Sequence, residues 1–169
     1  MIYLKASLKY GLAAFFVSLI AFLTFHFLDF KPLLNLNTLV LDIIIIGVFT
    51  FLASKEFRDY VNNKSLRFWQ GMTIGFFVYM IMALCFSISV FVLMEFILPD
   101  ILIEYKAQAA LFLEESEVKS EGLITAEEFE KRLQTLENTT SWDLTISAFF
   151  KKVVVGMLLT PVSSIFLRR

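Results

Sequence analysis

Long apolar runs separated by short polar segments dominate the pattern of this chain. Three runs occupy residues 10–28, 33–53 and 68–98, and a fourth occupies 142–167. A helix advances about 1.5 Å per residue, so about 20 mostly apolar residues are needed to cross a bilayer core about 30 Å thick. The pattern therefore predicts an all-α membrane protein with four transmembrane helices over these ranges.

The fourth run contains two lysines and a proline. Residues 153–167 alone would make a helix of about 22 Å, which is too short for the bilayer core. A helix that begins near Trp142 is long enough, and it places Lys151 and Lys152 inside the span. Pro161 is compatible with such a helix, because nearby hydroxyl groups can satisfy the backbone carbonyl that proline leaves free.

The polar segment between the third and fourth runs, residues 100–141, carries two further helical patterns. Apolar residues recur at helical spacing from Ile101 onward, Gly122 breaks the pattern, and a capping-box pattern at Thr125 opens a second helix. We therefore predict an external amphipathic helical hairpin, inserted into a single membrane domain that comprises the whole chain, 1–169.

Part of this insertion, residues 117–128, also invites comparison with a calcium-binding loop. Gly122 and Glu128 stand at positions that such a loop requires. Lys119, however, stands where an oxygen ligand is needed. Capped helices with solvated acids explain the segment better, so we predict no metal site.

Composition strengthens the membrane assignment and excludes several kinds of site. The chain is 58% hydrophobic, whereas an ordinary soluble domain is about 45–50% apolar. Cys85 is the only cysteine, which excludes an intrachain disulfide and a cysteine-based metal site. The sequence shows no nucleophile–base pair, phosphate loop or nucleic-acid signature, so we predict neither catalysis nor a cofactor.

The N-terminus has the short basic start of a signal peptide. Its apolar run is too long for one, and no small-x-small cleavage site follows it. We therefore expect the first apolar run to remain as a transmembrane helix.

Lysine and arginine positions predict the orientation, because cytoplasmic loops of membrane proteins carry an excess of these residues. With four spans, the basic residues of the two termini and of the loop after the second helix share one side: Lys5, Lys9, Lys55, Arg58, Lys64, Arg67, Arg168 and Arg169. The loop of residues 99–146 is on the other side and holds eleven acids and four bases. We expect both termini to lie in the cytoplasm.

Ionisable residues inside membrane spans are costly and are therefore candidates for function. Five such residues fall toward the external ends of their predicted helices: His26, Asp42, Glu95, Lys151 and Lys152. Glu95 with either lysine is the best candidate ion pair. One hypothesis is a polar pocket for an anionic ligand, such as a lipid headgroup. We favour the alternative, in which the lysines pair structurally, or their stems lie in the hydrocarbon while their ammonium groups reach the headgroups.

Glycines predict where helices approach each other closely. Gly71 and Gly75 form a G-x-x-x-G pattern at the start of the third helix, and Gly156 lies in the fourth. Such small residues let two membrane helices pack backbone to backbone. The partner helix belongs either to the same chain or to another protein, and we favour the same chain.

Three stretches, "EFRDYVNNKSLRFWQGMTIG", "FILPDILIEYKAQ" and "VVVGMLLTPVSSIFLRR", resemble the domain-of-unknown-function 4199 family of bacterial integral membrane proteins, found mainly in Bacteroidetes. The resemblance extends over nearly the whole chain. One departure is Leu98, where the family often has an aspartate before the proline. The resemblance implies no known activity. It also implies genes near polyprenol-type sugar transferases, which suggests envelope glycan assembly.

The function we expect is that of a non-enzymatic accessory or scaffold protein of the bacterial inner membrane, and the resemblance links it to envelope glycan or lipid assembly. Its expected partners are the lipid bilayer and a membrane protein or a second copy of the chain, and not nucleic acid. The alternative is a small transporter or channel that uses the polar residues near the external face. A membrane enzyme acting on lipid-linked substrates is a third hypothesis, supported only by the family resemblance.

Overall fold

The computed structural model describes residues 2–28, 33, 36–119 and 126–168, and these residues form helices without any strand. The elements are α1 (Ile2–Phe27), α2 (Leu36–Glu56), the π-helical turn η1 (Phe57–Val61), α3 (Phe68–Val92), the π-helical turn η2 (Leu93–Ile97), α4 (Asp100–Lys119), α5 (Ala126–Glu137) and α6 (Ser141–Leu167). The chain divides into two compact units. The first comprises Met1–Ser89 with Ser147–Arg169, and the second comprises Val90–Ile146.

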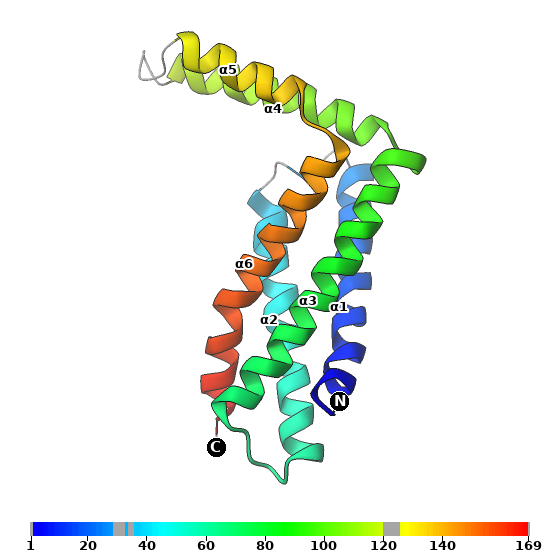
Figure 1. Ribbon diagram of the computed structural model, residues 1–169, viewed down its shortest axis with the longest axis vertical. Coiled ribbons are helices and arrows are strands. Elements are labelled where there is room, and N and C mark those ends of the chain that lie inside the picture. Colours follow the sequence, from blue (N-terminus) through cyan, green and yellow to red (C-terminus); the bar gives the residue numbers. More distant parts are fainter. Residues whose placement is uncertain (1, 29–32, 34–35, 120–125, 169) are drawn as a thin grey trace. The chain divides into compact units, whose positions relative to one another are not determined.

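Four stretches of helix are long and apolar enough to cross a membrane, namely Ile2–Phe27, Thr38–Val61, Phe68–Ile97 and Ser141–Leu167. They confirm the predicted all-helical class and the four apolar spans. Within the first unit, α1, α2 and the larger parts of α3 and α6 run alongside one another, and both termini lie at the same end (Figure 1).

The first helix is longer than its hydropathy predicts, since α1 begins at Ile2 and not near Tyr10. Lys5 and Lys9 interrupt the apolar run, but a lysine is a good helix former and does not interrupt the helix. Tyr3 packs against the buried cluster at this end of the first unit, which holds the added turns in place.

Two further boundaries follow from local chemistry. The third span ends at Ile97 because Pro99 cannot continue the helix, and α4 begins directly afterwards. At the start of α6, the Asp143 carboxylate accepts a hydrogen bond of 2.9 Å from the Thr140 amide, and the Thr140 hydroxyl accepts one of 3.3 Å from the Asp143 amide. This reciprocal cap explains why the helix begins at Ser141, close to the predicted start.

Glycines lie at the closest approaches between helices of the first unit. A Cβ atom added at Gly11 would lie 2.9 Å from Cβ of Ile81, which brings α1 against α3. A Cβ atom at Gly71 would lie 2.7 Å from the Ser164 hydroxyl oxygen on α6. Both distances are shorter than a normal contact, so only glycine permits this packing.

Gly75 and Gly156 make the tightest contacts between α3 and α6. A Cβ atom at Gly75 would overlap the side chain of Thr160, and one at Gly156 would overlap the ring of Tyr79. Thr50 of α2 also contacts the Gly75 position, so three helices meet there. The three glycines predicted to pack helices therefore all lie at contacts within this chain.

In the second unit α4 and α5 lie side by side (Figure 1). The Lys106 ammonium on α4 donates a 2.7 Å hydrogen bond to the Glu137 carbonyl at the end of α5. Burial raises the pKa of the Tyr105 phenol on α4, because the ionised form would lose its hydration. The predicted break at Gly122 and cap at Thr125 lie outside the described residues.

Candidate functional site: an ion pair among four helices

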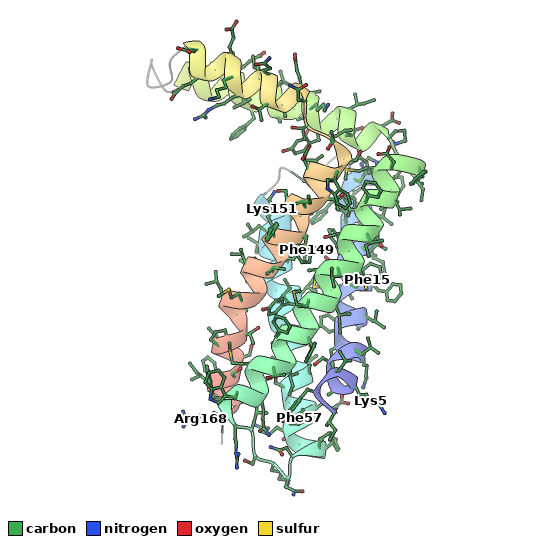
Figure 2. The ribbon with its side chains drawn as sticks, viewed as in Figure 1. Lys5, Phe15, Phe57, Phe149, Lys151 and Arg168 are labelled. Atoms are coloured by element: carbon green, nitrogen blue, oxygen red, sulfur yellow. The ribbon has the colours of Figure 1, made fainter. Side chains whose placement is uncertain are left out.

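The two adjacent lysines of α6 face in different directions. Successive residues of a helix point about 100° apart. Lys152 is only 2% exposed, whereas Lys151 is exposed on α6 (Figure 2). Lys152 shares its helix face with Gly156 and Thr160 at intervals of four residues, and all three are buried in the first unit. The close contacts at Gly156 therefore turn the Lys152 side chain toward the interior of this unit.

The Lys152 ammonium forms an ion pair with the carboxylate of Asp42 on α2. It also donates a 3.1 Å hydrogen bond to the Ser18 hydroxyl on α1, and that hydroxyl donates one of 3.3 Å to Asp42. The ring centroid of Phe86 on α3 lies 3.9 Å from the ammonium nitrogen. All four membrane-length helices therefore contribute one side chain to this site.

Both charges are largely removed from solvent, since the side chain of Lys152 is 3% exposed and that of Asp42 is 14% exposed. Removing a single charge from water costs several kcal/mol, and an opposite charge with good hydrogen bonds offsets that cost. The aromatic face of Phe86 adds a favourable cation–π contact. Each charge therefore depends on its partner, and loss of either one leaves the other buried and uncompensated.

The other three predicted polar residues lie elsewhere. Lys151 is exposed, and His26 is half-buried with its ring against Phe27. Glu95 is exposed in η2 and belongs to the second unit. The predicted partner of Lys152 is thus corrected from Glu95 to Asp42, because α2 and α6 bring these two side chains together within one unit. A pair between Glu95 and Lys151 stays a prediction.

Ser18 was not singled out from the sequence, although a signal for it exists. Small residues recur along α1 at Ser7, Gly11, Ala14 and Ser18, at intervals of three or four, and all are buried. A stripe of small residues at that spacing marks a packing face of a membrane helix. That face carries the Ser18 hydroxyl toward Asp42.

A second polar cluster joins α1 to α2 near the end that holds both termini. The Tyr10 hydroxyl donates a hydrogen bond to the Glu56 carboxylate, and the Lys9 ammonium lies 3.2 Å from the same oxygen. Lys9 is exposed and Glu56 is half-buried, so this cluster contributes less to stability than the buried pair.

Four buried hydroxyl groups among the described residues have no hydrogen-bond partner in the structure: Thr38, Thr50, Ser54 and Ser87. Three of these residues lie on α2, the helix that carries Asp42. No cluster of three or more histidine, cysteine, aspartate or glutamate side chains suited to a metal ion occurs in the described part of the chain. The buried polar chemistry of the first unit, among the described residues, is therefore that of the Asp42–Lys152 pair and several hydroxyl groups.

An apolar groove lies on the surface of the first unit between α2 and α6. It has a volume of about 340 Å³ and is lined by Gly47, Val48, Phe51, Leu52, Leu159, Val162, Ser163 and Phe166. The residues of the Asp42–Lys152 pair do not line it.

The comparison with known families gives one result. The family model described as "Protein of unknown function (DUF4199)" matches residues 9–169. The chain belongs to the DUF4199 family. No curated protein and no solved structure matches it. Membership of DUF4199 agrees with the resemblance noted from the sequence, but it names no activity.

Proposed function

We propose that this protein is a non-enzymatic accessory protein of a bacterial inner membrane, in which four packed helices anchor a helical docking element. The docking element is the pair α4 and α5. Its partner is an envelope membrane protein with a basic and partly apolar surface. In line with the family resemblance, we place that partner in envelope glycan or lipid assembly.

The observation that carries this proposal is the exposed apolar surface of α4. Ile103 is 65% exposed, Leu111 is 59% exposed and Phe112 is 70% exposed. These side chains stand in a segment that is otherwise rich in acids, with eleven acids and four bases over residues 99–146. Leu111 and Phe112 are neighbours on α4, and adjoining exposed apolar side chains within a polar segment favour an interaction surface.

The charge of the segment specifies the partner further. An acidic surface attracts a basic one and repels another acidic surface, and this selects partners and speeds their encounter. A second copy of this chain would present the same acids, so a different protein fits the surface better.

The close helix contacts of the first unit support a role as an anchor. Glycines at Gly11, Gly71, Gly75 and Gly156 leave no room for an added methyl group. Helices packed this closely resist movement relative to one another, because a close-packed interior leaves the side chains no free space to move into.

The test is purification from native membranes in a mild detergent, with quantitative mass spectrometry of the proteins that come with the chain. We expect an envelope protein to copurify with the wild type. We expect the triple variant Ile103→Ser, Leu111→Ser, Phe112→Ser to retain about a tenth of it or less, since a docking contact of this kind is worth at least about 1.4 kcal/mol. The variant Gln134→Ser on α5 is the control, because it changes an exposed side chain and leaves every acid in place, and it should retain the partner.

Two results would refute the proposal. One is a wild-type chain that purifies only with itself. The other is a triple variant that holds the partner as strongly as the control variant does.

A second candidate function is a small transporter or channel. The buried pair of Asp42 and Lys152 favours it, because ionisable residues inside a membrane span commonly mark the pathway of an ion or proton. Flux of ions or protons into liposomes that contain the purified chain tests this candidate. Equal flux in the wild type and in the double variant Asp42→Asn, Lys152→Met would contradict it.

A further inference from the structure

Gly47 on α2 differs from the glycines at the close helix contacts. At those glycines an added Cβ atom would lie closer than 3.0 Å to a side chain of another helix, whereas at Gly47 it would lie an ordinary 3.7 Å from Leu159 on α6. Alanine is a better helix former than glycine, and the packing of α2 against α6 leaves room for it here. The contact between these two helices therefore does not account for a glycine at this position.

Gly47 lines the apolar groove between α2 and α6, at the end of the groove that lies deepest in the span. From Gly47 the groove passes Phe51 and Leu52 on α2, and on α6 it runs from Leu159 to Phe166. That stretch of α6 is about 11 Å long, and one leaflet provides about half of a core about 30 Å thick. The groove therefore fits within the leaflet on the side of the two termini, and a larger side chain at Gly47 would fill its inner end.

Two basic residues follow the groove at its outer end. Lys55 comes four residues after Phe51 and three after Leu52, so it lies on the same side of α2 as the groove lining. Arg168 follows Phe166 by two residues, directly after α6 ends, and α2 and α6 run in the same direction through the first unit (Figure 1). Both basic side chains are exposed. The apolar groove therefore ends at two cations.

The acids that follow Lys55 in the chain are held by other cations. The Glu56 carboxylate binds a lysine of α1, and Asp59 pairs with Arg58 at 2.8 Å. Lys55 attracts Asp59 only over a longer distance. In the described part of the chain no ion pair includes Lys55 or Arg168. The outer end of the groove therefore keeps a positive charge that the neighbouring acids do not neutralise.

The size of the groove decides between the apolar groups that a membrane offers. A helix with its side chains is about 10–12 Å across, and one turn advances about 5.4 Å. A groove of about 340 Å³ holds less than one such turn, so it is too small for a transmembrane helix of another chain. An acyl chain is a single row of carbon atoms, which pack at about 4 Å from the atoms of a wall. A narrow apolar groove therefore fits an acyl chain.

We propose that this groove binds one anionic phospholipid of the leaflet on the side of the termini. One acyl chain lies in the groove between Gly47 and Phe166, and Lys55 and Arg168 hold the headgroup phosphate. A guanidinium donates paired hydrogen bonds to phosphate oxygens, and an ammonium binds them as a point charge. A zwitterionic lipid has the same acyl chain, but its own cation repels the two basic side chains. The site belongs to the first unit, so it is independent of docking by α4 and α5.

The first experiment tests the headgroup. Native mass spectrometry of the purified full chain is performed with equal amounts of phosphatidylglycerol and phosphatidylcholine that carry the same acyl chains. We expect one phosphatidylglycerol to be retained in preference. Lys55→Gln should weaken its binding about fivefold, which is the contribution of one basic residue to the attraction of an anionic lipid. Lys5→Gln is the matched control, because it removes the same charge from an exposed lysine of α1, which does not line the groove.

The second experiment tests the acyl chain. Phosphatidylglycerol with a photoreactive diazirine near the end of one acyl chain should label residues 47–52 and 159–166 in membranes. Gly47→Leu fills the inner end of the groove and should abolish this label. Val154→Leu is its control, because it enlarges an exposed side chain of α6 outside the groove and should keep the label. Glycerol 3-phosphate has the phosphate without the acyl chain, and it should not displace the lipid.

The outcomes separate this lipid from other occupants. Weaker binding in Lys55→Gln than in Lys5→Gln, together with loss of the label in Gly47→Leu, supports the site. Lys55→Gln changes an exposed side chain, so it keeps the test valid if Gly47→Leu folds poorly. Equal retention of the two lipids, equal effects of the two lysine variants, or displacement by glycerol 3-phosphate overturns the proposal. A complex of two copies that Gly47→Leu separates also overturns it, because the groove would then hold a second copy.

Discussion

Two neighbouring lysines of this chain have unlike roles, because helix geometry separates them by about 100°. Lys151 is exposed, and we expect its stem to lie in the hydrocarbon while its ammonium reaches the headgroups. Lys152 is buried, and its ammonium forms an ion pair with Asp42, donates a hydrogen bond to Ser18 and lies over the ring of Phe86. Lys151 is thus a surface residue, and Lys152 is the central residue of the candidate site.

The buried pair predicts a specific pattern of stability changes. Lys152→Met or Asp42→Asn alone should lower the free energy of unfolding by about 3–5 kcal/mol, because each leaves one buried charge without a partner. The double variant Asp42→Asn, Lys152→Met should recover most of that loss. Unfolding by denaturing detergent, followed by circular dichroism, measures the effect.

Lys151→Met is the matched control for this prediction, since it removes an adjacent lysine that is exposed. It should change the stability by about 0.5 kcal/mol or less. Equal effects of Lys151→Met and Lys152→Met would contradict the assignment of the buried pair.

The helices of the first unit are held together by close contacts at glycines. In lipid there is no hydrophobic force to drive apolar helices together, so dense packing and hydrogen bonds between helices provide the attraction. Gly75 and Gly156 of α3 and α6 carry the tightest of these contacts. The contacts also set the rotation of α6 that directs Lys152 inward, so packing and the candidate site depend on each other.

Added methyl groups test this packing. Gly75→Ala and Gly156→Ala should each lower the free energy of unfolding by about 1–3 kcal/mol, because the methyl group overlaps Thr160 or Tyr79. Gly47→Ala is the matched control, since its Cβ would lie an ordinary 3.7 Å from Leu159. Thermal unfolding in one detergent compares the three. Equal tolerance at all three positions would show that the close approach is absent.

At the scale of the whole molecule, charge decides the expected orientation. Within the first unit, Lys5 and Arg168 lie at the end that holds both termini (Figure 2). The basic residues of η1 and of the loop before α3 follow the end of α2 at that same end. This clustering supports the proposal that both termini face the cytoplasm, because positive residues are retained on that side.

Labelling of single cysteines tests the orientation. In a background with Cys85→Ser, Gln134→Cys on α5 should react with a membrane-impermeant maleimide in spheroplasts, and Lys64→Cys in the loop before α3 should react only after the membrane is opened. Both side chains are exposed in the structure, so burial does not limit the reaction. The reverse order of labelling would place the termini outside.

The sequence by itself determined the four apolar spans, the two helices of the polar segment, the presence of lysines inside the last span and the family resemblance. Each of these depends on local composition or local pattern. The bilayer requires about 20 apolar residues per helix, and a run of that length is visible in the sequence.

Only the tertiary structure decided that Lys152 pairs with Asp42, that Ser18 joins them, and which hydroxyls lack partners. The physical reason is that a membrane helix is apolar around its whole circumference, because lipid covers its outer faces. The period of its hydrophobic residues therefore does not reveal which face turns inward, and only small residues such as those of α1 mark part of that face. That face is set by contacts between helices far apart in the chain, such as the approach of Gly156 to Tyr79.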